Sequence, residues 1–162
     1  MHSDIHYRTI AAEAVRRAAV AEPPVPIEDL AAGLGVPLRA AHLPAFFSGA
    51  IIAEDGMPVV LLNSALEEGT RRQTLAHLLG HVLIVLADPA EVYPRNSEPV
   101  HREANAAASE LLLPEQLVRE QSRKWFNDHR YLAGLFGVNE SQMMSRMREL
   151  GIIKAREVLW DY

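Results

Sequence analysis

The chain has 162 residues, of which 49% are hydrophobic, so it is long enough to bury one core. Its formal net charge of -5 is spread along the sequence without a basic block, which argues against sequence-independent binding to nucleic acids. The absence of cysteine excludes disulfides and thiolate metal ligands. No apolar run approaches the ~18 residues of a transmembrane helix, so we expect a cytoplasmic, soluble protein without a membrane partner.

The first half of the chain changes from helical to strand-like periodicity and back. We expect a helix over residues 4–20, a short helix over 27–35, a β-hairpin within 46–63 and a long apolar helix from Thr70. Asn63 and Ser64 offer caps for a further short helix between the hairpin and the long helix.

The second half is mainly helical. We expect a loop over 87–99, a helix over 100–113, another from Pro114, two helices on either side of 137–139, and a final strand or tail over 152–160. The pattern predicts an α+β fold that is mainly helical. We expect residues 1–125 and a helix-turn-helix-like segment over 126–162 to pack together as a single compact unit.

The long apolar helix contains two histidines four residues apart. His77 and His81 therefore lie on one helical face and can present two imidazoles to one metal ion. Such pairs also occur in ordinary helices, where they are core histidines. Leucine and valine surround this pair, however, and burying two imidazoles there is costly unless something satisfies their nitrogens. A metal ion would do so.

The following helix offers a third ligand. At about 100° per residue, one of its faces carries His101, Ala104, Asn105, Ala108 and Leu112, whereas Arg102, Glu103, Ala106 and Glu110 point elsewhere. The apolar face turns inward, so His101 is the candidate ligand and Asn105 is placed to orient a ligand histidine. Glu103 is the fallback ligand by residue type. A surface histidine at the helix start is the alternative for His101.

The last two expected helices resemble a helix-turn-helix. Asn139 and Gln142 form a plausible capping box at the start of the second helix. Side chains for a recognition helix would be Gln142, Ser145, Arg146 and Arg148. Because Glu140 and Glu149 flank them in an acidic chain, we favour a packing role over direct binding to nucleic acid.

Four motifs occur in the order found in ImmA/IrrE-type metallopeptidases: "PVVLLN", "RRQTLAHLLGH", "HREANAAASELLLP" and "FGVNESQMMSRMRELGII". The chain resembles this family from about Pro24 to Ile153. The resemblance implies a small zincin-like metallopeptidase fold with a short β-sheet and one zinc ion. It also implies action on a helix-turn-helix transcriptional repressor, in stress responses or on mobile elements.

Two positions depart from the family pattern. Leu78 stands where the family has its catalytic glutamate, and His101 stands where it has a glutamate ligand. Three histidines still form a sound zinc site with an open fourth position. The lost acid/base group contributes roughly 10²–10⁴-fold to such reactions. We therefore expect a zinc-binding, catalytically impaired regulator.

Two alternatives remain open. The first is an active zinc endopeptidase in which Glu98, Glu103 or Tyr93 replaces the missing base. The second, with less support from the charge, is a DNA-binding transcription factor.

Overall fold

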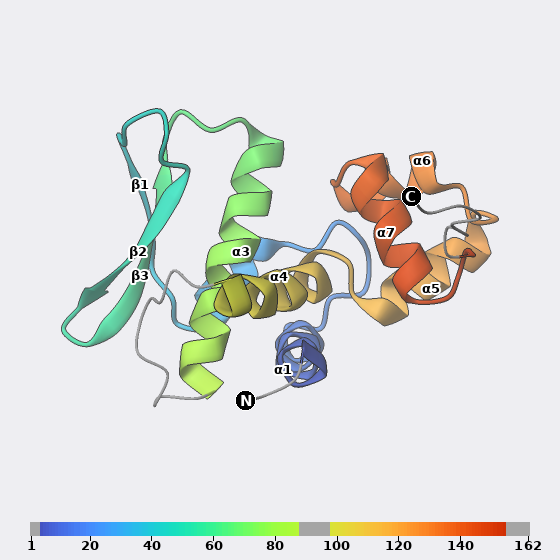
Figure 1. The fold of residues 1–162 in the computed structure, drawn as a ribbon, viewed down its shortest axis with the longest axis horizontal. Coiled ribbons are helices and arrows are strands. Elements are labelled where there is room, and N and C mark those ends of the chain that lie inside the picture. Colours follow the sequence, from blue (N-terminus) through green and yellow to red (C-terminus); the bar gives the residue numbers. More distant parts are fainter. Residues whose placement is uncertain (1–3, 88–97, 155–162) are drawn as a thin grey trace, which may run out of the picture.

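The computed structural model describes residues 4–87 and 98–154 (Figure 1). These residues form seven helices and one three-stranded sheet. The elements are α1 (Asp4–Arg17), α2 (Ile27–Gly33), β1 (Leu38–Ala41), β2 (Gly49–Glu54), β3 (Met57–Asn63), α3 (Glu68–Ala87), α4 (Glu98–Leu112), α5 (Glu115–Lys124), α6 (His129–Phe136) and α7 (Glu140–Glu149). The expected α+β, mainly helical class is confirmed.

The sheet has the order β1-β3-β2. The expected hairpin is confirmed as the antiparallel pair β2 and β3, joined by Asp55 and Gly56 at φ values of 51° and 78°. Two positive φ values are what a tight two-residue hairpin turn requires. Strand β1, which the sequence did not predict, pairs with β3 in parallel. It has only four residues and no alternation of buried and exposed positions.

The prediction of a short helix after the hairpin is wrong. Asn63 is buried and uses its side chain to hold two turns instead. Its amide donates to the carbonyls of Leu43 and Phe47 at 3.1 and 2.9 Å, and its side-chain oxygen accepts from the Ala65 amide at 3.1 Å. Of the loop expected over 87–99, Ala87 ends α3 and residues 98 and 99 begin α4, while 88–97 lie outside the described residues. The end of the last apolar run, from 155, also lies outside them.

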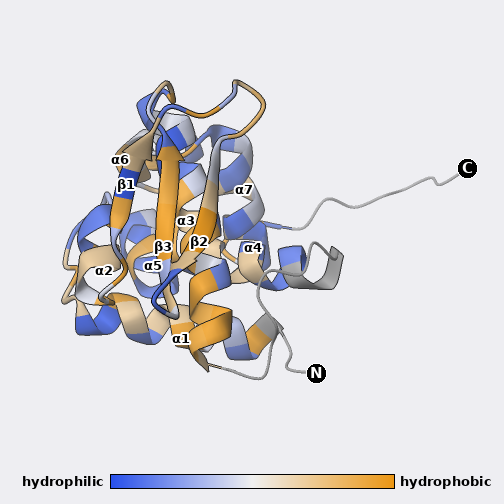
Figure 2. Ribbon diagram, turned by 90° about the vertical axis from the view of Figure 1, so that its left-hand side faces the viewer, coloured by the Kyte–Doolittle hydropathy of each residue, from blue (hydrophilic) through white to orange (hydrophobic). Residues whose placement is uncertain are grey.

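Helix α3 is the centre of the fold, with the sheet on one side and α1 and α4 on the other (Figure 1). Strands β2 and β3 carry hydrophobic residues along the part that lies over α3 (Figure 2). Helix α4 crosses α3 at Gly80, where an added Cβ would lie 2.4 Å from the Ala104 carbonyl oxygen. This position therefore needs glycine, and the close crossing brings the start of α4 over the middle of α3.

Helices α6 and α7 form the expected helical pair around Gly137, which ends α6 at φ 69°. The predicted cap of α7 is confirmed in part, because the Asn139 side chain accepts from the Gln142 amide at 2.8 Å. The Gln142 side chain is instead hydrogen-bonded to the Gln73 side chain on α3. No helix in the described part of the chain is both long and apolar enough to cross a membrane.

Candidate metal centre

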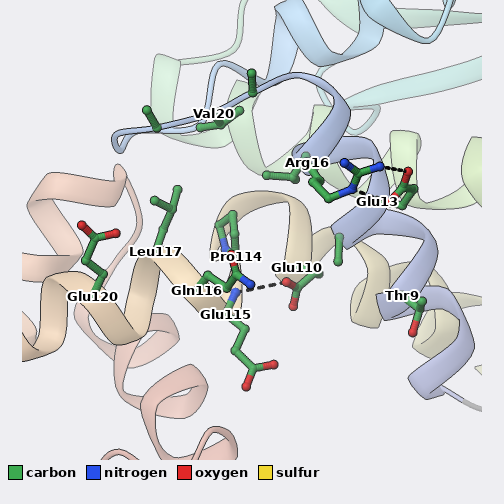
Figure 3. A pocket seen from close by; sticks show the side chains of 14 residues that line it. Thr9, Glu13, Arg16, Val20, Glu110, Pro114, Glu115, Gln116, Leu117 and Glu120 are labelled. Carbon is green, nitrogen blue, oxygen red and sulfur yellow. Dashed lines mark hydrogen bonds and ion pairs between the residues drawn. The ribbon is translucent and has the colours of Figure 1, made fainter.

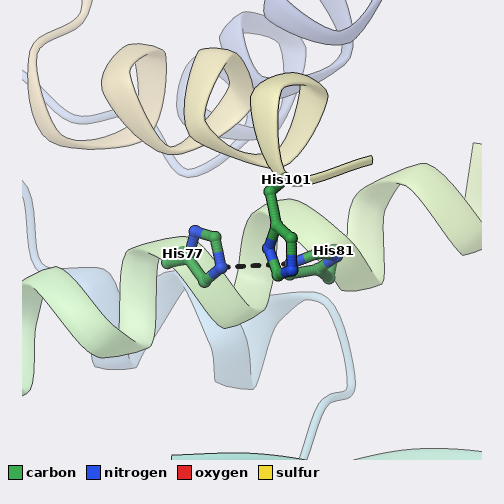
Figure 4. A group of neighbouring side chains, drawn as sticks. All are labelled: His77, His81 and His101. Atoms are coloured by element: carbon green, nitrogen blue, oxygen red, sulfur yellow. Dashed lines mark hydrogen bonds between the residues drawn. The ribbon is translucent and has the colours of Figure 1, made fainter. Parts of the chain in front are cut away.

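Three histidine side chains meet where α4 crosses α3 (Figure 4). His77 and His81 come from consecutive turns of α3, and His101 comes from the first turns of α4. One ring nitrogen from each lies within 4.8 Å of the other two. The ring centroids are 4.6 Å apart for His77 and His81, 5.6 Å for His77 and His101, and 5.2 Å for His81 and His101.

The glycine that permits this arrangement was not singled out in the sequence. Gly80 lies between the two α3 histidines and lets the α4 backbone approach, which places His101 above them. An isolated glycine inside an apolar helical pattern is the available signal, because it costs helix stability unless close packing requires it.

The spacing of the His77 and His81 nitrogens fits one tetrahedral ion, and a His101 nitrogen lies within 4.8 Å of the other ligand atoms. The Nε2 atoms of His77 and His81 are 3.1 Å apart. Two nitrogens bound to one zinc ion at ~2.0–2.1 Å lie roughly 3.3 Å apart in tetrahedral geometry. The residues present therefore fit a divalent ion that accepts imidazole ligands.

Asn105 fixes the ring of His77. Its side-chain oxygen lies 2.8 Å from His77 Nδ1, which makes Nδ1 the hydrogen-bond donor and leaves the Nε2 lone pair facing His81 and His101. A hydrogen bond of this kind orients a metal-binding histidine and raises its basicity. Asn105 does this from an exposed position on α4.

The electrostatics of the cluster favour a neutral His81 ring. Burial, followed by charge repulsion from His77 and His101, lowers the pKa of His81 to about 4. Neutral imidazole is the form that binds metal, so His81 does not have to lose a proton at neutral pH before it can act as a ligand.

The helical face assigned to α4 from its sequence is displaced from the buried face, because Asn105, expected to point inward, is exposed. Glu110 and Ala106 were expected to point away from the core, but both are 6% exposed. The reason is that α4 is covered by α3 on one side and by α1 on another. Glu103, the fallback ligand, is half-buried and does not belong to the cluster of converging ligand atoms in the described residues.

Leu78 occupies the space between α3 and the sheet. A Cβ added to Gly49, the first residue of β2, would lie 2.9 Å from Leu78 Cδ1. The leucine is half-buried against the core and offers no lone pair next to the three rings. Of the residues considered as substitutes for the base, Tyr93 and the side chain of Glu98 lie outside the described part of the structure.

The residues considered for DNA contact lie in different environments. Arg146 is 3% exposed and paired with Glu110, so the idea that it reaches a base edge is wrong. Gln142 is held by Gln73 on α3. Ser145 is exposed and Arg148 is half-buried. Helix α7 therefore turns Gln142 and Arg146 toward the rest of the protein.

Comparison with known proteins gives one family and several solved structures of similar fold. The profile of Peptidase M78, described as the IrrE N-terminal-like domain, matches residues 31–148, which include α3 and α4. No curated protein matches the chain. A Mycobacterium tuberculosis transcriptional regulator of known structure is similar with a TM-score of 0.64 and 17% sequence identity, over 88% of this chain and 47% of that chain. The chain thus spans about half of that regulator, and the likeness concerns the fold alone.

Proposed function

The chain belongs to the Peptidase M78 family, whose shared region is the IrrE N-terminal-like domain, and on this premise we propose a zinc-binding regulator with impaired peptidase activity. Its proposed partner is a helix-turn-helix transcriptional repressor, which it binds without efficient cleavage. The observation that carries the proposal is the convergence of His77, His81 and His101 beside a leucine at position 78.

The chain's own residues divide the work of such a site. His77, His81 and His101 would hold the ion, and Asn105 keeps the first of them in the ligand orientation. When bound, zinc lowers the pKa of a coordinated water and polarises a carbonyl oxygen. Leu78 cannot accept a proton or return it to a leaving amine, a role worth roughly 10²–10⁴-fold in rate.

Support for a repressor partner comes from two sides. The family resemblance of the motifs implies that class of partner, and the fold relative of known structure is a transcriptional regulator. Direct DNA binding is disfavoured by the net charge of -5 and by the burial of Arg146.

The test restores the missing carboxylate. Zinc-loaded wild type, Leu78→Glu and Leu78→Gln are compared for cleavage of helix-turn-helix repressors cloned from the genome that encodes the chain. We expect Leu78→Glu to cleave its repressor roughly 10²-fold faster or more than wild type. The Gln variant matches the shape of Glu but has no base, so it should stay at the wild-type rate.

Binding is measured in parallel, because loss of cleavage and loss of recognition must be separated. Wild type and Leu78→Gln should bind the same repressor that Leu78→Glu cleaves. A wild type that cleaves as fast as the Glu variant would instead establish the second candidate, an active endopeptidase with another base. That candidate is supported by the intact set of three histidines.

A further inference from the structure

The turn between α5 and α6, residues 125–128, carries an unusual phenylalanine. Phe126 is 93% exposed and has a φ of 52°. A bulky side chain in the left-handed region is a strained conformation, and nothing in the described chain covers the ring to compensate for it. Strained residues cluster at functional sites, so the exposed ring is a candidate contact residue.

The surrounding structure holds Phe126 in place. The amide of Asn127 donates to the Ser122 carbonyl at 2.9 Å, and the amide of Asp128 donates to the Trp125 carbonyl at 3.0 Å. The Trp125 ring lies 4.5 Å from the Tyr131 ring, centroid to centroid. A phenyl ring on a rigid turn suits a preformed pocket, since little conformational entropy is lost on binding.

Helix α5, which leads into this turn, has an exposed face with opposite charges at its two ends. Glu115 and Glu120 are exposed in its first six residues, called the acidic half here, where the half-buried Arg119 pairs with Glu115 at 2.9 Å, and Arg123 and Lys124 are exposed at its end. This order also complements the helix dipole. The dipole, however, does not explain why the Phe126 ring is exposed. An antiparallel α5 helix from another molecule would place opposite charges against both ends of this helix.

A groove of about 560 Å³ lies beside the acidic half of α5, between this helix and α1 (Figure 3). Its apolar lining includes Val15, Val20 and Leu117, and its acidic lining includes Glu13, Glu115 and Glu120. The wall also contains Ala19, a second non-glycine residue in the left-handed region, at φ 53°. Glu13 is paired with Arg16 and Glu115 with Arg119. The groove therefore offers an apolar floor for a ring and the Glu120 carboxylate for a neighbouring cation.

We propose that two copies of the chain associate through antiparallel α5 helices, with Phe126 of each copy in the α1–α5 groove of the other. A helix of 10 residues is about 15 Å long, so a two-fold axis near its middle exchanges its two ends. The basic turn of one copy then meets the acidic half of the other, twice. The interface lies away from the histidine cluster and does not depend on zinc.

The first test uses the strained position. Phe126→Asn removes the ring and introduces a residue that accepts φ 52°. Sedimentation equilibrium should show a concentration-dependent dimer for wild type and a dissociation constant at least about tenfold higher for the variant. The melting temperature of the variant, measured on monomer, should not fall, since the strain is relieved. Phe46→Asn is the matched control, because Phe46 is 81% exposed in a different loop and should leave dimerisation unchanged.

The second test uses charge reversal. Arg123→Glu should weaken the homodimer, and Glu120→Lys should do the same, because each places like charges opposite one another at both ends. A mixture of the two variants should form a heterodimer with affinity near that of wild type, since both ends are complementary again. The proposal also requires the wild-type dimer to weaken as salt rises.

Three results would overturn the proposal. These are a wild type that stays monomeric up to the solubility limit, a dimer that is unaffected by Phe126→Asn, and charge-reversed variants that do not associate when mixed.

Discussion

The two ends of helix α4 carry polar clusters that are satisfied in opposite ways. Near its start, His101 joins His77 and His81, and the three rings direct nitrogen atoms at one another. Near its end, Glu110 meets Arg146 from α7 in a buried ion pair. Both clusters are partly or fully removed from water, but only the second contains its own opposite charge. The comparison separates a polar site that the chain completes from one that needs an added cation.

The cluster at the end of α4 contains further hydrogen bonds. Glu110 also accepts from the Glu115 amide at 3.0 Å, and Arg146 also donates to the Leu113 carbonyl at 3.0 Å. Burial raises the pKa of Glu110, and the charge of Arg146 opposes that rise. These contacts fasten α7 to α4, so this cluster acts in the fold.

The largest expected effect comes from breaking the complete cluster. Arg146→Met leaves Glu110 buried and unpaired, which should lower the free energy of unfolding by about 3–5 kcal/mol. The double variant Glu110→Leu with Arg146→Met should recover most of that loss, because no buried charge remains. Urea unfolding measures both. If the single variant lost less than about 1 kcal/mol, the pair would not be buried in solution.

Zinc should complete the other cluster and stabilise the fold by a smaller amount. At a free concentration 100 times its dissociation constant, an ion that binds only the folded state adds about 2.7 kcal/mol. His81→Ala should abolish the rise in melting temperature, and His42→Ala, an exposed histidine outside the cluster, should keep it. A zinc-dependent rise that survives His81→Ala would place the ion elsewhere.

Asn105 should affect zinc affinity without holding the ion. Losing an outer partner of a ligand histidine weakens metal binding by about 10–100-fold. We expect this for Asn105→Leu, which removes the acceptor that lies 2.8 Å from His77 Nδ1. Asn105→Asp keeps an acceptor at the same place and should stay close to wild type. Competition with a chromophoric chelator measures the constants, and equal affinities for wild type and Leu would exclude an orienting role.

The sequence was informative about the incomplete cluster and misleading about the complete one, because it placed Glu110 away from the core and Arg146 at a DNA-facing surface. Helical spacing puts His77 and His81 on one face, and motif order points to His101 as their partner. Glu110 and Arg146 carry no such local signal. Whether they are buried depends on where α7 packs, which is a long-range property that periodicity within one helix does not contain.

The same limit explains the errors in the fold. The β2–β3 hairpin was predictable because its turn chemistry and its two apolar runs are neighbours in the chain. Strand β1 is short and forms by parallel pairing with β3, so its stability comes from a partner about twenty residues away. Asn63 is of a residue type that often caps helices, but the nearby 43–47 loop gives its side-chain amide other acceptors.

The smallest expected effect concerns the exposed ion pairs of Glu13, which contrast with the buried pair of Glu110 and Arg146. Hydrogen bonds from Arg16 and then Arg17 lower the pKa of Glu13 from 4.5 to about 2. Because the folded-state pKa is lowered, the stabilisation is present above pH 4.5 and is lost as the pH falls toward 2. Glu13→Gln should therefore reduce the melting temperature slightly at pH 6 and not at all near pH 2. The difference at pH 6 should shrink in high salt, whereas the loss caused by Arg146→Met should not, since solvent ions screen only the exposed pair. A Glu13 carboxyl that titrates near 4.5 by NMR would show that the pair does not persist in solution.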